Sequence, residues 1–236
     1  MPDLKEISSF QEGKVLLIDK EFNWTSFDAV NKIRILLKKK LGIKKIKVGH
    51  AGTLDPLATG LIIVCTGKMT KQITNFQDLE KEYEAILKLG ETTPSFDLES
   101  SVDKTFPTDH ITQEKLLKVL QSFVGEIDQI PPLFSAKYIN GTRAYEFARK
   151  GSGLELKPQK IKIFSIDLVF FKMPYVKIKV NCSKGTYIRS LARDIGQSLE
   201  SGAYLSELKR TRIGQHYLKK AVSINEFEKS LESYVT

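Results

Sequence analysis

The chain has 236 residues, and its 41% of hydrophobic residues suffices for the core of one large domain. Lysine and arginine (37) outnumber aspartate and glutamate (28), and the resulting formal net charge of +9 favours a polyanionic partner such as nucleic acid. The composition excludes a membrane-spanning chain, a secretory leader, a disulfide framework and a zinc site, because long apolar runs are absent and the two cysteines and three histidines are scattered. We therefore expect a cytoplasmic protein without a metal.

The first predicted elements are apolar strands and one helix. Residues 13–20 form a short apolar strand, and Ser26 is the expected N-cap of a helix. The apolar face of that helix is predicted to carry Phe27, Val30, Ile33 and Leu37. Residues 61–65 (LIIVC) are typical of a buried strand, and alternating apolar residues over 83–89 predict a strand with one more polar face.

The second half of the chain continues this mixture. Thr112 is the expected N-cap of a helix that runs to Val124 and stops at Gly125. Further elements are strands at 160–172, 175–182 and 204–213 and helices at 187–199 and 224–234. Because short turns join neighbouring strands antiparallel, we expect an α+β fold: a central mixed, mainly antiparallel sheet flanked by helices. Without repeats or linkers, one domain over residues 1–236 is the default.

The segment GHAGTLDPLATG, residues 49–60, places one acid, Asp55, among glycines and small residues. Pro56 stiffens the loop, and helix or strand hydrogen bonding does not dictate the direction of the side chain. This is how a catalytic carboxylate is presented, although most Asp-Pro pairs in loops cap a turn. The loop alone leaves both interpretations open.

A second segment with candidate functional residues, NCSKGTYIRSLARDI at residues 181–195, places Arg189 on the first turn of a helix. An arginine there can fork onto a carboxylate, and Asp55 is the partner we expect; the alternative is an arginine in solvent. In a third segment, residues 129–149, aromatic and basic residues alternate, which suits stacking on unpaired bases. Phe134 and Phe147 also fit a hydrophobic core.

Two patterns bear on the ligand. Residues 60–68, GLIIVCTGK, lack the glycine spacing and the Ser/Thr of a phosphate-binding P-loop, since Met69 stands there, so nucleotide hydrolysis is not supported. The basic run LLKKKLGIKKIK, residues 36–47, fits nucleic-acid binding but also a solvated helix face.

Four motifs, in this order and at these separations, resemble the TruB family of tRNA pseudouridine synthases: GHAGTLDPLATGLIIVCTGKMTK, KEYEAILKLGETT, QIPPLFSAKYINGTRAYEFARKG and CSKGTYIRSLARDIG. The resemblance extends from GKVLLIDK to LKRTRIG, nearly the whole chain. It implies the pseudouridine synthase fold with an active-site cleft, and a uridine in the T-arm loop of tRNA, position 55 by convention, as the target. The isomerisation involves no redox change, so no cofactor is expected.

The resemblance also implies roles for individual residues. Asp55 matches the essential aspartate, Arg189 the arginine that pairs with it, and Tyr83 the tyrosine that stacks on the flipped base. His50 matches the residue that fills the space vacated by the base. Further pocket positions are matched by Tyr187, Lys71 and Leu208.

The chain departs from the family pattern in three places, which leaves details of RNA contact open. In DKEFNW, Glu21 and Asn23 replace a proline and a glycine, and TPSFDLES carries Pro94, Ser95 and Ser100 at substituted positions; Tyr is common where Phe134 stands. We expect a family core over about residues 10–214 and a short tail with a helix over 215–236, in place of a C-terminal PUA-type RNA-binding domain.

That organisation predicts a stand-alone enzyme, a monomer that needs no guide RNA or protein partner and binds tRNA through its own basic surface. Two alternatives remain: a non-catalytic RNA-binding or tRNA-folding module, and the same chemistry on another RNA stem-loop.

Overall fold

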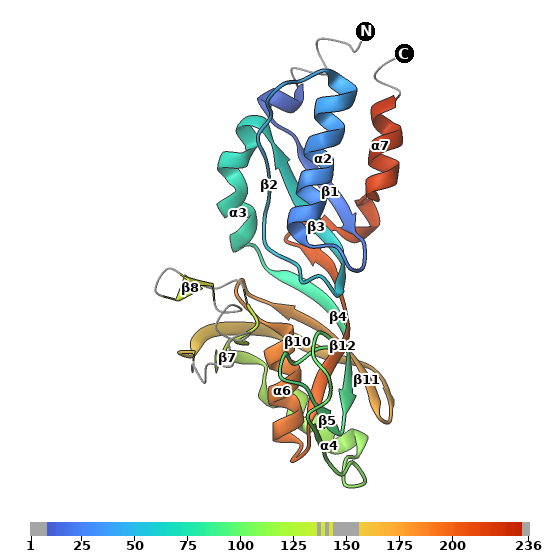
Figure 1. Ribbon diagram of the computed structural model, residues 1–236. Coiled ribbons are helices and arrows are strands. Elements are labelled where there is room, and N and C mark those ends of the chain that lie inside the picture. The colour runs from blue at the N-terminus through green and yellow to red at the C-terminus, as the bar shows by residue number, and fades with distance from the viewer. Residues whose placement is uncertain (1–8, 136–137, 140–141, 144–155, 233–236) are drawn as a thin grey trace. The chain divides into compact units, whose positions relative to one another are not determined.

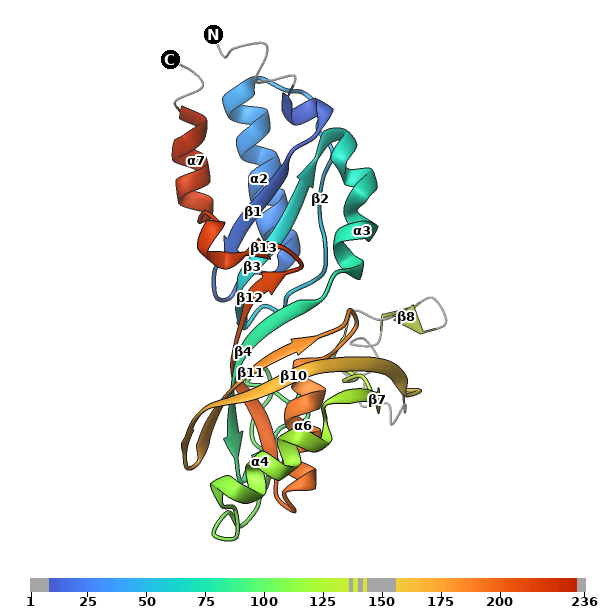
Figure 2. The ribbon, with the colours of Figure 1, turned by 180° about the vertical axis from the view of Figure 1, so that it is seen from behind.

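The computed structural model describes residues 9–135, 138–139, 142–143 and 156–232, which form two compact units (Figures 1 and 2). Unit 1 comprises residues 1–83 and 209–236, and unit 2 comprises residues 84–208. The chain passes from one unit to the other within two strands, β4 (Lys81–Leu89) and β12 (Ala203–Ile213).

The strands of unit 1 centre on β3 (Ala58–Thr66). β1 (Val15–Lys20) pairs with it antiparallel, with Val15 opposite Cys65 and Lys20 opposite Gly60. β2 (Val48–His50) also pairs antiparallel with β3, and β13 (His216–Tyr217) forms a hairpin with the end of β12. Residues 61–65 are fully buried, which confirms the predicted buried strand.

Two helices of unit 1 share one hydrophobic core: α2 (Ser26–Leu41) and α7 (Ile224–Glu232) lie side by side in both ribbon views. Phe10 packs edge-on against Phe227 in the same core. Unit 1 also contains η1 (Gly67–Gln72), α3 (Ile73–Asp78) and η2 (Leu218–Lys220).

The start of α2 differs from the prediction. Its N-cap is Thr25, whose hydroxyl accepts from the backbone of Asp28 while the Asp28 carboxylate accepts from the backbone of Thr25. Ser26 is instead the first helical residue, and its side chain is buried. Phe27 was expected on the apolar face but is 64% exposed. The face of α2 that meets the core carries the buried residues Ser26, Ala29, Val30, Ile33, Leu36, Leu37 and Leu41. At the spacing of an α-helix, Phe27 lies outside this face.

In unit 2, β10 (Gln159–Lys172) lies between β11 (Tyr175–Cys182) and β7 (Gly125–Gln129), antiparallel to both. Lys172 pairs with Tyr175 across Met173-Pro174, so the two strands predicted at 160–172 and 175–182 form a hairpin. The short strands are β5 (Glu91–Thr92) with β6 (Lys104–Thr105) and β8 (Tyr138–Ile139) with β9 (Thr142–Arg143).

The helices of unit 2 are α4 (Gln113–Ser122) and α6 (Ile188–Ser198), which contact each other. Thr112 caps α4 as predicted, since its hydroxyl accepts from the backbone of Lys115. The helix ends at Ser122, and Gly125 does not stop it but begins strand β7, which the sequence analysis did not predict.

The α+β fold class is confirmed, with antiparallel strand pairs and helices packed beside them. In the part of the chain that the structure describes, no helix is both long and apolar enough to cross a membrane.

Candidate active site

Asp55 lies on the loop that leads from β2 into β3 in unit 1. The residue is half-buried, between the buried Leu54 and the exposed Pro56. The turn that follows is closed by the backbone, because the amide of Ala58 donates to the Asp55 carbonyl at 3.1 Å. The carboxylate therefore stands at the entrance of a buried strand, on a short irregular segment.

The five backbone carbonyls from Gly52 to Pro56 each accept a hydrogen bond. Their donors, in order, are Arg210 Nη2 for Gly52, Arg210 Nη1 for Thr53, Ser26 Oγ for Leu54, the Ala58 amide for Asp55, and the Asn23 amide with Lys20 Nζ for Pro56. These distances lie between 3.0 and 3.3 Å. Donors outside the loop thus fix its path, which is what a preorganised catalytic side chain needs.

Two buried cations, Lys20 and Arg210, stand behind this loop; their exposures are 0% and 1%. Besides the Pro56 carbonyl, Lys20 Nζ donates to the carbonyls of Glu21 at 2.8 Å and Trp24 at 2.6 Å. Burial lowers the pKa of Lys20 to about 8, and attraction to the Asp55 carboxylate partly offsets that shift. Sequence reasoning missed both residues; the signal was a basic residue closing an apolar strand in GKVLLIDK and another in LKRTRIG.

His50 ends strand β2 opposite Val64 and is half-buried. Burial lowers the pKa of its imidazole, the nearby Gly52 backbone acts in the opposite direction, and the charge of Arg210 lowers the pKa further. The ring is therefore neutral at pH 7. A neutral, partly desolvated ring is suited to filling a gap in a stack of bases.

Tyr83 lies on β4 and is 8% exposed. The buried face of β4 also carries Lys81, Ala85, Leu87 and Leu89, so the predicted alternation of buried and less buried residues is confirmed. Tyr83 is held within a strand, where its ring is a rigid surface.

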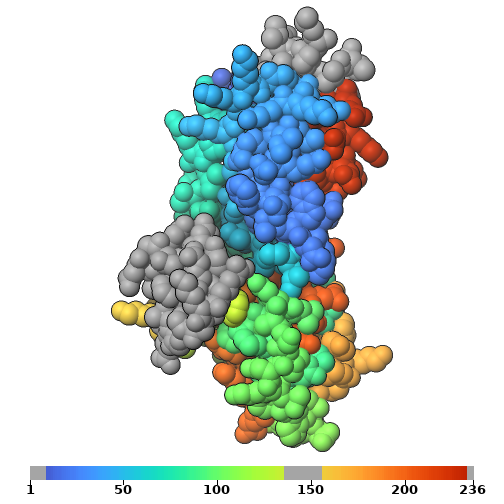
Figure 3. Space-filling view, in the orientation of Figure 1, coloured from blue at the N-terminus to red at the C-terminus, as the bar shows by residue number. Residues whose placement is uncertain are grey.

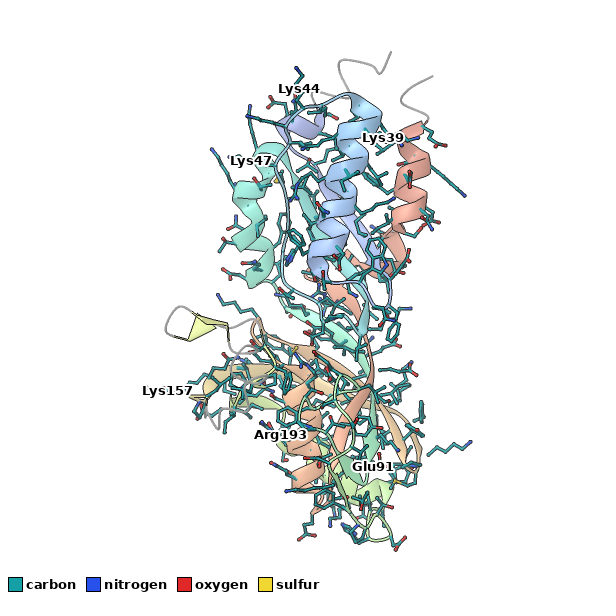
Figure 4. All side chains as sticks on the ribbon, viewed as in Figure 1. Lys39, Lys44, Lys47, Glu91, Lys157 and Arg193 are labelled. Carbon is teal, nitrogen blue, oxygen red and sulfur yellow. The ribbon has the colours of Figure 1, made fainter. Side chains whose placement is uncertain are left out.

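Lys71 lies at the end of η1 and is exposed. It lines a pocket of about 400 Å³ in unit 1, which we call the lysine pocket. The basic residues that line it are Lys45, Lys47, Lys68 and Lys71. Figure 4 shows Lys44 and Lys47 projecting outward from the segment between α2 and β2, and Figure 3 shows the exposed surface of that part of the chain. Most lysines of the predicted basic run thus face solvent, and η1 adds Lys68 and Lys71 to the same surface.

Arg189 is the second residue of α6 in unit 2, on the first turn as predicted. It is 3% exposed, so the alternative of an arginine in solvent is wrong. Its Nη1 lies 3.4 Å from a carboxylate oxygen of Asp97, and Nη2 donates to the Phe134 carbonyl at 2.9 Å. Sequence reasoning missed Asp97, whose motif TPSFDLES had been noted only for its departures.

Tyr187 is the N-cap residue of α6 and is half-buried. Its backbone amide donates to Gln129 Oε1 at 2.8 Å, and Gln129 Nε2 donates back to its carbonyl at 3.1 Å. Leu208, on β12, is also half-buried.

The seven site residues predicted from the sequence divide between the units. Unit 1 holds Asp55, His50, Tyr83 and Lys71, and unit 2 holds Arg189, Tyr187 and Leu208. Within unit 1, His50 is the last residue of β2, and the loop that follows it carries Asp55 and is held by Arg210 and Lys20. The pairing of Asp55 with Arg189 stays a prediction. Of the predicted segment 129–149, residues 136–137, 140–141 and 144–149, including Phe147, lie outside the described residues.

The departures from the family pattern have local structural explanations. Asn23 adopts a left-handed backbone with φ of 63°, which asparagine tolerates better than most residues and where the family has glycine. The exposed Glu21 contributes its carbonyl to Lys20. Ser95 and Ser100 bond to each other, their hydroxyl oxygens 2.7 Å apart, while Pro94 is exposed.

Comparison with known proteins gives consistent matches. Residues 38–188 match the family described as TruB family pseudouridylate synthase (N terminal domain), and residues 189–236 match the tRNA pseudouridylate synthase B C-terminal domain. Similar proteins include tRNA pseudouridine synthase B of Phocaeicola vulgatus, 57% identical over 95% of each chain, and that of Parabacteroides distasonis, 57% identical over 96% of each.

Among solved structures, the chain resembles one in the crystal structure of a Cbf5-Nop10-Gar1 complex, with 28% identity and a TM-score of 0.69. That match covers 96% of this chain and 59% of the other.

Proposed function

This chain belongs to the TruB family of pseudouridylate synthases, and from that membership we propose that it isomerises the uridine at position 55 of tRNA, in the T-arm loop, to pseudouridine. The observation that carries the proposal is the 57% identity, over nearly the full length of both chains, to proteins named tRNA pseudouridine synthase B. The net charge of +9 agrees with a nucleic-acid substrate.

The reaction needs a carboxylate and no cofactor. The bond between uracil N1 and ribose C1′ breaks, the base turns over, and C5 bonds to C1′; C5 loses a proton and N1 gains one. Atoms and electrons balance without an oxidant or a second substrate. The Asp55 carboxylate acts at the sugar, either as nucleophile or as base, and Arg189 pairs with it and keeps it aimed.

Access to the uridine requires base flipping, which costs a few kcal/mol of stacking energy. The buried ring of Tyr83 stacks on the flipped base, and the neutral His50 fills the space it vacates. Leu208 and Tyr187 line the pocket and keep water from the separated sugar and base. Lys71 contacts the RNA backbone from the lysine pocket.

The enzyme works as a stand-alone monomer in the cytoplasm, without a guide RNA. In support, the chain matches 95–96% of the length of the tRNA pseudouridine synthase B relatives, but 59% of the Cbf5-type chain. Its tRNA affinity comes from its own basic surface, including the lysine pocket.

The assignment can be tested with a tRNA transcript that carries tritium at C5 of uridine, because C5 loses its hydrogen during the reaction. The wild-type protein should release one equivalent of tritium per tRNA, and Asp55→Asn should release none while still binding tRNA. Asp109→Asn, at an exposed position, serves as a matched control and should behave as wild type. Wild-type protein that binds tRNA without releasing tritium would instead support the non-catalytic RNA-binding module.

A further inference from the structure

Arg210 is the most deeply buried arginine among the described residues, at 1% exposure. Its guanidinium donates in three directions: Nε to the Leu61 carbonyl at 2.7 Å, Nη1 to the Thr53 carbonyl at 3.3 Å and Nη2 to the Gly52 carbonyl at 3.2 Å. The first acceptor lies on β3, and the other two lie on the loop that carries Asp55.

The backbone is arranged so that this side chain can reach the loop. Gly60 has φ of 101°, and a Cβ atom there would lie 2.4 Å from the Arg210 carbonyl oxygen. Glycine therefore permits close approach of β3 to the backbone of Arg210. From that position the planar fork spans two successive loop carbonyls, a geometry that the single ammonium of a lysine does not reproduce.

All three acceptors are neutral carbonyls. The cost of removing the guanidinium charge from water is therefore not offset by a carboxylate in these three bonds. Stability alone does not call for a charge here, because neutral donors could also satisfy backbone carbonyls. Two bonds from one planar arginine to the loop just before a catalytic carboxylate, with a third to β3, have a clearer use in fixing the geometry of the loop, where an error of about 1 Å costs ~10²-fold in rate.

We propose that Arg210 is a positioning residue: its guanidinium holds the Gly52–Thr53 backbone so that the Asp55 carboxylate keeps its reactive orientation. This inference rests on the proposed function, since it assumes that Asp55 acts on the target uridine. Arg210 acts through the loop and need not touch the RNA.

The test compares single-turnover tritium release with tRNA affinity in Arg210→Lys, which keeps the charge and loses the fork, and in Arg210→Met. Arg212→Lys is the matched control: it lies two residues further along the same strand and pairs with Glu80 at 2.6 Å. We expect the rate of Arg210→Lys to fall by roughly 10- to 100-fold, in a protein that still folds and binds tRNA with near wild-type affinity. Arg212→Lys should keep the full rate.

The wild-type rate in folded Arg210→Lys would overturn the proposal, and so would a loss of tRNA affinity that accounts for the whole loss of activity. If Arg210→Met fails to fold, Arg210→Lys decides the matter by the same criteria. Asp55→Asn is measured in parallel: tritium release by that variant would contradict the proposed function, whereas a silent Asp55→Asn with a fully active Arg210→Lys contradicts only the role of Arg210.

Discussion

The ammonium group of Lys20 is a positive charge on a fully buried side chain. Its three ammonium donors are directed at backbone carbonyls, one of them in the Asp55 loop, and its interaction with the Asp55 carboxylate is attractive. Burial nevertheless lowers its pKa from 10.5 to about 8. The ammonium group that donates to the Asp55 loop therefore loses its charge within an accessible pH range.

We predict that the single-turnover rate declines as pH rises through about 8, because deprotonation removes one loop donor and the charge beside Asp55. The free energy of unfolding should change in the opposite direction to the rate. Between pH 8 and 10.5 the unfolded state binds more protons at Lys20 than the folded state, so this residue makes the free energy of unfolding increase with pH. The decline in rate should therefore occur without unfolding.

The measurement is a pH–rate profile with circular dichroism at each pH. Lys20→Arg, which stays charged, is the comparison, and its alkaline decline should move to higher pH. Identical profiles for the two proteins would show that Lys20 is not the titrating group.

Asp97 and Arg189 form a buried pair, with side-chain exposures of 7% and 4%. Asp97→Asn removes a buried carboxylate that lies 3.4 Å from the Arg189 guanidinium, so we predict a loss of about 3 kcal/mol in the free energy of unfolding. The reaction should also slow, since Arg189 loses an anchor. Urea denaturation measures the first effect. The control is Glu114→Gln, which removes an exposed ion pair with Lys118 and should leave the urea midpoint unchanged. A shift no larger than that of the control would contradict the assigned importance of the buried pair.

Sequence reasoning proposed Asp55 and Arg189 as site residues because a glycine-rich Asp-Pro loop and a helix-start arginine are local patterns. Lys20, Arg210 and Asp97 were missed for a physical reason. A charged residue in a short motif can face solvent or a set of backbone carbonyls, depending on which strands and loops surround it in the fold. The spacing of residues in the sequence does not give this information.

Two adjacent residues at the start of α2 have different roles. Thr25 caps the helix, and Ser26 reaches across to Leu54, accepting from its amide at 2.8 Å and donating to its carbonyl at 3.0 Å. The helix start thus supports both its own stability and the loop next to Asp55.

These tasks are separable by mutation. Thr25→Ala should lower the free energy of unfolding by about 1 kcal/mol and leave the catalytic rate unchanged. Ser26→Ala should lower it by about 1–3 kcal/mol through the unsatisfied Leu54 backbone groups and also slow the reaction several-fold. Thermal melts and single-turnover rates of the two variants check this, and equal rates would contradict the link between α2 and the loop.

Long periodic elements were predictable, and short ones were not. The strand at Tyr83 and the helix capped by Thr112 have patterns long enough to fix their faces. β2 and β7 were missed because three to five residues give little periodicity and their pairing is set by β3 and β10. Phe27 was misplaced because hydrophobicity alone does not tell which row of a helix meets the core.

At the scale of the whole molecule, RNA affinity depends on where the excess of positive charge lies. The structure brings Lys45 and Lys47 together with Lys68 and Lys71 around the lysine pocket, although more than 20 residues separate the two pairs in sequence. Charge reversal of Lys44, Lys45 and Lys47 to glutamate should weaken tRNA binding and flatten its dependence on salt, because fewer counterions are released.

The matched control reverses three exposed lysines of unit 2, Lys104, Lys160 and Lys172, and changes the net charge by the same amount. Filter binding from low to high salt gives the slope for each protein. An unchanged slope in the first variant, or equal slopes in both variants, would contradict a localised RNA-binding surface.

We propose that Asp55 of this chain is required to make pseudouridine at position 55 of tRNA. Position-resolved mapping of pseudouridine in total RNA tests this in cells that lack the gene and carry either the wild-type copy or Asp55→Asn. We expect pseudouridine in the T loop with the wild-type copy and unmodified uridine there with Asp55→Asn. Pseudouridine at that position with Asp55→Asn as the sole copy, or a wild-type signal confined to other RNAs, would contradict it.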